Sequence, residues 1–180
     1  MKKRNVAILI VVITALAVGA WWYVRKEKGP VSDIEFPKVG SVAKDFSLPD
    51  IANQGKMVSL AEFRGKKAVY INFWASWSPF SRDEMKDLAT MQKEFTSSLT
   101  VLAINRAEDR PMAERHAKSL DVFGPYPLLS DSTDEIWKLY KGFAMPTSIF
   151  IDKNGIIRDV KFGPLTLEEM RERVRKVLPP

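Results

Sequence analysis

The sequence predicts an α/β domain in which helices flank a central mixed sheet, preceded by one hydrophobic N-terminal helix. Three features predict it: an uncharged segment at 6–24, two apolar runs at 68–74 and 99–105, and a hairpin signal at 153–155. Parallel strands joined through a helix and a final antiparallel hairpin share one sheet, so helices must cover both of its faces. A chain of 180 residues is long enough for one such domain and short for two.

The first 38 residues are predicted to lie outside this domain. Residues 6–24 carry no charge, and as a helix they would span about 28 Å, close to the roughly 30 Å hydrocarbon core of a bilayer. Three basic residues precede the segment, so the positive-inside rule holds residues 1–5 in the cytoplasm. We therefore expect a transmembrane signal-anchor at 6–24, a linker at 25–38 and an extracytoplasmic domain at 39–180. A cleaved signal peptide ending near Val18-Gly19-Ala20 is the alternative, and it also exports the domain.

Charge and composition exclude several classes of function. The net charge is +6, but residues 1–28 hold six basic residues against one acidic residue, which leaves +1 for the rest. A nucleic-acid partner is therefore not expected. The absence of cysteine excludes disulfides, thiolate nucleophiles, zinc–thiolate sites and iron–sulfur clusters. His116 is the single histidine, so a metal site built from several imidazoles is excluded and Ser/His catalysis would depend on this one residue. We therefore expect no metal and no cofactor.

The first half of the domain should contain a hairpin, a buried strand and a long helix. Segments 45–48 and 57–60 flank the turn-forming stretch 53–56 and predict an antiparallel hairpin. Ser59 then caps a short helix that Gly65 ends. The continuous apolar run 68–74 predicts a buried central strand. A helix follows at about 79–95, with Met85, Leu88 and Phe95 among its inward positions.

The second half should contain a strand, two helices, a hairpin and a last helix. Residues 99–105 predict a second buried strand, and Asp109 caps a helix that runs to 120. A short segment at 128–130 leads to a helix at 133–141, which Gly142 ends. The stretch 153–155 joins strands at 147–152 and 156–162. Thr166 and Glu169 form a capping box that opens the last helix, and Pro179-Pro180 ends it.

The most informative stretch is FWASWSPFSRDEM, residues 73–85, where a buried strand meets a helix. It resembles the thioredoxin superfamily, and within it the membrane-anchored thiol-disulfide oxidoreductases of the ResA/TlpA type that serve cytochrome c maturation. That group carries W-C-x-x-C-[RK]-x-E here. Trp77, Arg82 and Glu84 match this pattern, while Ser78 and Ser81 stand where both cysteines belong.

The resemblance extends over nearly the whole chain and implies a thioredoxin-like fold with an N-terminal β-hairpin extension. It includes GSVAKDFSLPD at 40–50 and GFAMPTSIFIDKNG at 142–155. In the family, the proline before the last hairpin is cis and faces the active-site pair; Pro146 occupies that position. The resemblance therefore implies a substrate-binding site formed by Trp77, Pro79, Met145 and Pro146.

The two serines change the chemistry. The family's first cysteine attacks as a thiolate, whose pKa is depressed by the helix N-terminus. A serine hydroxyl is not ionised near neutrality, and oxygen does not form and release a disulfide, so redox exchange by this sequence is excluded. Peroxidase chemistry needs a thiolate too and fails for the same reason.

Ser78 also has a structural role to play. We expect it to be the N-cap of the helix, with Ser81 and Glu84 forming a second capping-box pattern, S-x-x-E. As a nucleophile it would need a general base within reach. His116 is predicted to be a surface residue of another helix, so this alternative is disfavoured.

Two explanations for the missing thiols stay open. In the first explanation the serines are natural, and the protein binds exported polypeptides or apocytochrome c-like partners without turnover. Alternatively they replace the cysteines of an active oxidoreductase for cytochrome c maturation. We favour the first.

Overall fold

The computed structural model describes residues 14, 16–22 and 37–178. The chain divides into two compact units, Met1–Glu35 and Phe36–Pro180. In the first unit, residues 16–22 are helical and exposed. Nowhere in the described ranges does a helix have the length and hydropathy needed to cross a membrane. Most of the predicted anchor at 6–24 and nearly all of the predicted linker at 25–38 lie outside the described residues.

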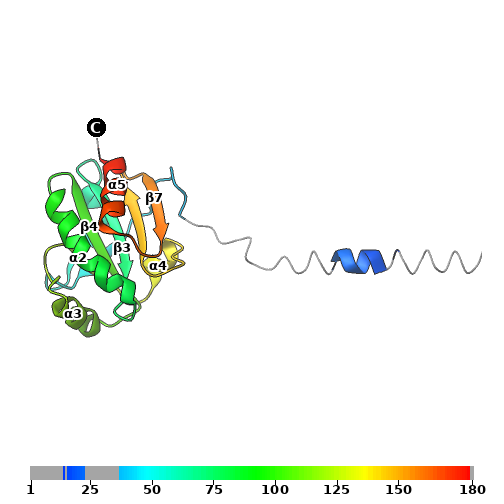
Figure 1. The fold of residues 1–180 in the computed structure, drawn as a ribbon, viewed down its shortest axis with the longest axis horizontal. Helices are drawn as coiled ribbons and strands as arrows, with labels where there is room; N and C mark the ends of the chain where they lie inside the picture. The colour runs from blue at the N-terminus through cyan, green and yellow to red at the C-terminus, as the bar shows by residue number, and fades with distance from the viewer. Residues whose placement is uncertain (1–13, 15, 23–36, 179–180) are drawn as a thin grey trace, which may run out of the picture. The chain divides into compact units, whose positions relative to one another are not determined.

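The second unit is built on one seven-stranded mixed sheet with the order β2-β1-β5-β4-β3-β6-β7 (Figure 1). β3 and β4 are parallel, as are β4 and β5, while β6 and β7 form the antiparallel hairpin that the sequence predicts. The strands are β1 (Ser47–Asp50), β2 (Lys56–Ser59), β3 (Ala68–Trp74), β4 (Leu99–Arg106), β5 (Leu128–Asp131), β6 (Thr147–Ile151) and β7 (Ile157–Phe162). The predicted thioredoxin-like α/β architecture is therefore confirmed.

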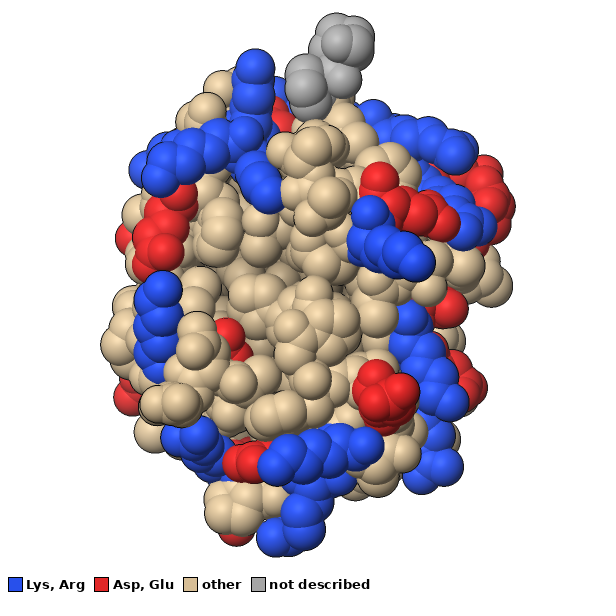
Figure 2. Space-filling model, turned by 90° about the vertical axis from the view of Figure 1, so that its left-hand side faces the viewer, with Lys and Arg blue, Asp and Glu red and all other residues tan. Residues whose placement is uncertain are grey.

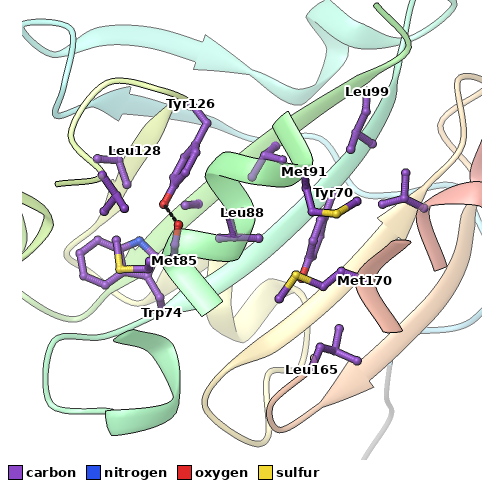
Figure 3. Close-up of a cluster of buried hydrophobic side chains, with 14 of the residues drawn as sticks. Tyr70, Trp74, Met85, Leu88, Met91, Leu99, Tyr126, Leu128, Leu165 and Met170 are labelled. Atoms are coloured by element: carbon purple, nitrogen blue, oxygen red, sulfur yellow. Dashed lines mark hydrogen bonds between the residues drawn. The ribbon is translucent and has the colours of Figure 1, made fainter. Parts of the chain in front are cut away.

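One face of the sheet carries three helices: α2 (Pro79–Glu94), α3 (Arg110–Ser119) and α5 (Leu167–Val177). Their apolar sides pack with those of β3 and β4 in one core cluster. Figure 3 shows Met85, Leu88 and Met91 along α2, with Met85 toward Trp74 and Met91 toward Tyr70 and Met170 of α5. Tyr126 also enters this core, and its hydroxyl donates to the Met85 carbonyl at 2.8 Å. The inward positions predicted for the long helix are confirmed, although Phe95 lies just past its end and is half-buried.

The opposite face is covered by α4 (Glu135–Leu139), the 3-10 helix η2 (Leu60–Phe63) and the segment before β1. Its core is aromatic, because Phe73 of β3 meets Trp137 edge-to-face and Tyr140 at a tilt. Phe46 closes this layer against Tyr140. As predicted, helical structure therefore covers both faces of the sheet.

The predicted N-terminal hairpin forms and extends the main sheet. β1 and β2 are antiparallel, and Asp50 of β1 pairs with Leu129 of β5. Ser59 caps η2 with its hydroxyl and with a capping box to Glu62.

The helix predicted at 133–141 is shorter in the structure and ends for a different reason. Asp134 precedes it in the left-handed region (φ 63°), so the helix begins at Glu135. Lys141, not Gly142, takes the positive φ (51°) at the C-terminal end. Gly142 is needed for space instead, because a Cβ there would lie 2.3 Å from the Trp137 ring.

Candidate functional site

Three segments meet at the end of the sheet where β3 and β4 finish. Trp74 pairs with Asn105, so the residues after both strands lie at the same edge. Phe73 pairs with Thr147, so Pro146, just before β6, lies at this edge as well. The Met145–Pro146 peptide bond is cis, as the family resemblance implied. The fold thus brings the loop at 75–78, the start of α2 and Pro146 to one end of the sheet.

Ser78 is the N-cap of α2, which confirms its predicted structural role. Its backbone is extended, Pro79 occupies the first turn, and the Ser78 hydroxyl accepts from the Ser81 amide at 3.4 Å. Ser78 is 2% exposed and Ser81 is fully buried. The Ser81 hydroxyl has no hydrogen-bond partner among the described residues. The two positions are therefore closed in by protein and are not hydroxyls in open solvent.

Glu84 does not form the predicted capping box with Ser81. Its side chain turns into the protein, where it is 2% exposed. One carboxylate oxygen accepts from the Leu165 amide at 2.5 Å and the other from Asn72 Nδ2 at 2.8 Å. Burial raises the pKa of Glu84 from 4.5 to about 7, although these two hydrogen bonds act in the opposite direction. Desolvation prevails, and the negative charges of Asp87 and Glu169 raise the pKa of Glu84 further.

A buried polar network connects Glu84 to the middle of the sheet. Asn72 Nδ2 also lies 3.3 Å from Ser148 Oγ, and that hydroxyl is 3.0 Å from the Tyr70 hydroxyl. Burial, together with the charge of Glu84, raises the Tyr70 pKa far above its ordinary value. A continuous hydrogen-bonded path therefore runs from Tyr70 to Glu84, and Asn72 donates to both of its neighbours along it.

Large apolar side chains lie on the surface around the buried serines. Trp77 is 63% exposed, Phe80 is 55% exposed, and Phe143, which precedes the cis-proline segment, is 64% exposed. Pro79 is exposed too, Met145 is half-buried and Pro146 is buried. Phe143 contacts the ring of Phe162 edge-on, so it is held in position. Exposed aromatic residues next to a sheet end suit binding of another polypeptide more than solvation.

The sequence reasoning missed Glu108, which fixes the loop before α2. Its carboxylate accepts from the Ser76 amide at 2.9 Å, the Ser76 hydroxyl at 2.5 Å and Asn105 Nδ2 at 2.6 Å. Glu108 follows β4 by two residues, and carboxyl ends of parallel strands meet at one edge, so its position was a usable signal. Glu108 therefore positions Ser76, the residue before Trp77.

His116 is not the surface residue that the sequence suggested. It is half-buried, and its ring stacks on Trp74 with centroids 5.9 Å apart. Burial and, less strongly, the charge of Arg82 lower its pKa. The Ser78 hydroxyl bonds the Ser81 amide and His116 Nε2 has no hydrogen-bond partner among the described residues, so a hydrogen-bonded Ser/His pair is not assembled.

Comparison with known proteins agrees with this geometry. Residues 39–160 match the AhpC/TSA family. The chain is 30% identical to the thiol-disulfide oxidoreductase ResA of Geobacillus kaustophilus, over 99% of this chain and all of the relative. It is 31% identical to the thioredoxin-like protein YneN of Bacillus subtilis, over 97% and 98% of the two chains.

Two solved structures support the same assignment. A thioredoxin-family thiol:disulfide interchange protein from Chlorobium tepidum superposes with a TM-score of 0.67 and 27% identity, covering 79% of this chain and 99% of its own. The exposed lipoprotein thioredoxin of Streptococcus pneumoniae gives 0.64 and 26%, covering 74% and 99%. The chain therefore belongs to the AhpC/TSA family, among its thioredoxin-like, ResA-related thiol-disulfide oxidoreductases, although it contains no cysteine.

Proposed function

We propose that this protein is a membrane-tethered, extracytoplasmic thioredoxin-like protein that binds extended polypeptides without redox turnover. The observation that carries the proposal is the pairing of Ser78 and Ser81 with an exposed aromatic surface. The two hydroxyls occupy the positions of the family's thiols, where Ser78 caps α2. The surrounding Trp77, Phe80 and Phe143 remain exposed. Loss of the thiols removes the exchange step but leaves the binding surface.

The partner class follows from the same surface. Exposed aromatic residues beside the N-terminal end of β6 suit an extended chain, which adds backbone hydrogen bonds to apolar contacts. An exported location is supported by the uncharged segment at 6–24 and by the exposed lipoprotein described among the structural relatives. The partners are therefore exported polypeptides, with apocytochrome c-like proteins as the first to test.

A capture experiment tests the binding role. A fluorescein-labelled, cysteine-free apocytochrome c fragment is titrated with the full-length protein, and anisotropy gives the dissociation constant. Trp77→Ala and Phe143→Ala should each weaken binding about tenfold, since buried aromatic contacts dominate such interfaces. Pro146→Ala should weaken it too, because it changes the backbone beside the bound chain.

Val42→Ala provides the matched control. Val42 is 59% exposed and bridges Ile156, at the opposite end of β6 from Pro146. Its replacement should leave the dissociation constant unchanged. Equal affinity of the wild type, the Trp77→Ala variant and the Phe143→Ala variant would reject the proposed surface.

The second candidate is an oxidoreductase whose cysteines have been replaced. The buried Glu84 and its network favour it, because a carboxyl with a pKa of about 7 is suited to exchange protons with a neighbouring thiol. The double variant Ser78→Cys/Ser81→Cys should then reduce insulin disulfides, and each single variant should not. An inert double variant would reject this candidate and leave the binding role.

The location has its own test. Alkaline phosphatase fused after residue 180 is active only outside the cytoplasm and should remain with the membrane fraction after a high-salt wash. Cytoplasmic fusion protein would contradict the export, and release by the wash would contradict the anchor.

A further inference from the structure

We infer that the end of the domain opposite the serine site docks on the anionic surface of the membrane that tethers the protein. The docking surface is a basic patch on the segments that border the sheet at this end, and it consists of Lys38, Arg64, Lys66, Lys67 and Lys153. The inference rests on the membrane tether of the proposed function. It does not depend on polypeptide binding at the serine site.

The strand directions bring the parts of this patch together. β3 and β4 both start at this end, because they are parallel and run toward the serine site. β6 is antiparallel to β3, so the turn that follows it, at 152–156, lies at this end as well (Figure 1). The Gly65 amide donates to the Lys153 carbonyl at 2.6 Å, and a Cβ on Gly155 would lie 2.8 Å from Arg64 Nε. The segment before β3 and the turn after β6 are therefore in contact.

The chain also enters the domain at this end. The Gly40 amide donates to the Ile157 carbonyl at 2.7 Å, which places Lys38 near the same turn. The predicted anchor at 6–24 is therefore connected to the domain beside the basic patch. A fully extended chain over 25–38 would reach roughly 50 Å, so the connection alone does not decide which end of the domain faces the bilayer. The charge of each end decides it.

The charge of the basic patch is not neutralised within the domain. Its side chains form no ion pair with another described residue, and all of them except Lys67 are exposed. The acidic side chains that lie nearest in the sequence already have partners. Glu62 accepts from the Ser59 amide at 2.9 Å, and Asp152 pairs with Arg158 at 2.7 Å. Figure 2, in which this end of the domain is uppermost, shows Lys and Arg side chains gathered along its upper edge.

Anionic headgroups are the negative surface that suits this patch. Each Lys or Arg near such a surface strengthens binding about fivefold, and the attraction acts within a Debye length of about 8 Å at physiological ionic strength. The tether keeps the headgroups at high local concentration around the patch. At the serine end the charges alternate in sign instead, as in Arg82-Asp83 and Asp109-Arg110. Docking therefore turns the serine site away from the bilayer, about 20 Å farther out, which is the length of β3.

Energy transfer from a fluorescein label to rhodamine-labelled lipid tests the docking. The chain has no cysteine, so Asn154→Cys in the turn after β6 and Ser132→Cys after β5, at the serine end, each provide one exposed labelling position. The full-length protein is incorporated into nanodiscs of phosphatidylcholine, alone or mixed equally with phosphatidylglycerol. Transfer from position 154 should rise in the anionic discs, and transfer from position 132 should not. In about 1 M sodium chloride, where the Debye length is about 3 Å, the rise should disappear.

The triple variant Lys38→Gln/Lys66→Gln/Lys153→Gln removes three exposed charges of the patch. At about fivefold for each charge, docking should weaken roughly a hundredfold. Transfer from position 154 in the anionic discs should then fall to the value measured in neutral discs.

The matched control is Lys86→Gln/Arg115→Gln/Lys138→Gln, which removes the same charge from exposed positions on α2, α3 and α4. It should keep the rise in transfer. Transfer that does not depend on lipid charge, or that is equal in the two triple variants, would overturn the inference and leave the tether intact. Protein that does not incorporate into either kind of disc would reject the tether, and the inference with it.

Discussion

Replacement of Glu84 by glutamine should remove a pH dependence from the stability of the fold. The Glu84 carboxyl is buried, and its pKa is raised from 4.5 to about 7 by desolvation. The folded protein therefore binds a proton more tightly than the unfolded chain between these two values. Stability contributed by this proton is fully present below pH 4.5 and is lost as the pH rises through about 7.

The magnitude follows from the two pKa values. Their difference corresponds to roughly 3 kcal/mol, at about 1.4 kcal/mol for each tenfold change in proton affinity. Glu84→Gln is neutral at every pH. Its amide oxygen can still accept from the Leu165 amide. Asn72 Oδ1 has no hydrogen-bond partner among the described residues, so rotation of the Asn72 amide lets this oxygen accept from the new glutamine nitrogen. The wild type should therefore lose about 3 kcal/mol more than the variant between pH 4.5 and 8.

Urea unfolding of both proteins at half-unit intervals between pH 4.5 and 8 measures this difference. All other titrating groups are shared, so subtracting the two curves isolates Glu84. Glu172→Gln, at an exposed position of α5, controls for the loss of one negative charge. Curves for the wild type and Glu84→Gln that stay parallel throughout would refute a raised pKa and the desolvation argument behind it.

Three further predictions concern single contacts. Ser78→Ala removes the N-cap of α2 and should lower the free energy of unfolding by about 1 kcal/mol in urea; no loss would mean that the 3.4 Å bond to Ser81 contributes nothing. Gly142→Ala should cost ~1–3 kcal/mol in thermal unfolding, because the new methyl would lie 2.3 Å from the Trp137 ring; an unchanged midpoint would contradict this contact. Glu108→Ala removes the acceptor for two donors of Ser76 and should cost roughly 2–4 kcal/mol and speed hydrogen exchange at the Ser76 amide; unaltered exchange would reject its positioning role.

Much of the fold could be read from the sequence because its strongest signals are local. The apolar run at 68–74, the N-caps Ser59, Asp109 and Thr166, and the turn at 153–155 each specify an element through short-range chemistry, and all of them form. The helix at 133–141 was predicted too long because its start depends on Asp134. That residue takes a left-handed backbone and pairs with Arg106, which is 28 positions away.

The candidate site could be predicted only in part, because several of its contacts join residues that are far apart in the sequence. Ser78 as an N-cap is a local pattern and is confirmed. The S-x-x-E pattern at Ser81 and Glu84 is local too, but the capping box it predicts is wrong. The Glu84 carboxylate accepts instead from the amide of Leu165, which is 81 residues away. Glu108 accepts a hydrogen bond from Ser76, and His116 stacks on Trp74. Each of these contacts joins two different segments, so no spacing rule within one helix or strand can specify it.

The most direct test of the account is the reduction of insulin disulfides by the purified, unaltered protein in the presence of dithiothreitol. With only hydroxyls at positions 78 and 81, the rate should equal that of dithiothreitol alone, while the Ser78→Cys/Ser81→Cys protein reports whether the site can work at all. A rate above the dithiothreitol background that rises in proportion to the concentration of the unaltered protein would contradict the proposal that it binds polypeptides without redox turnover.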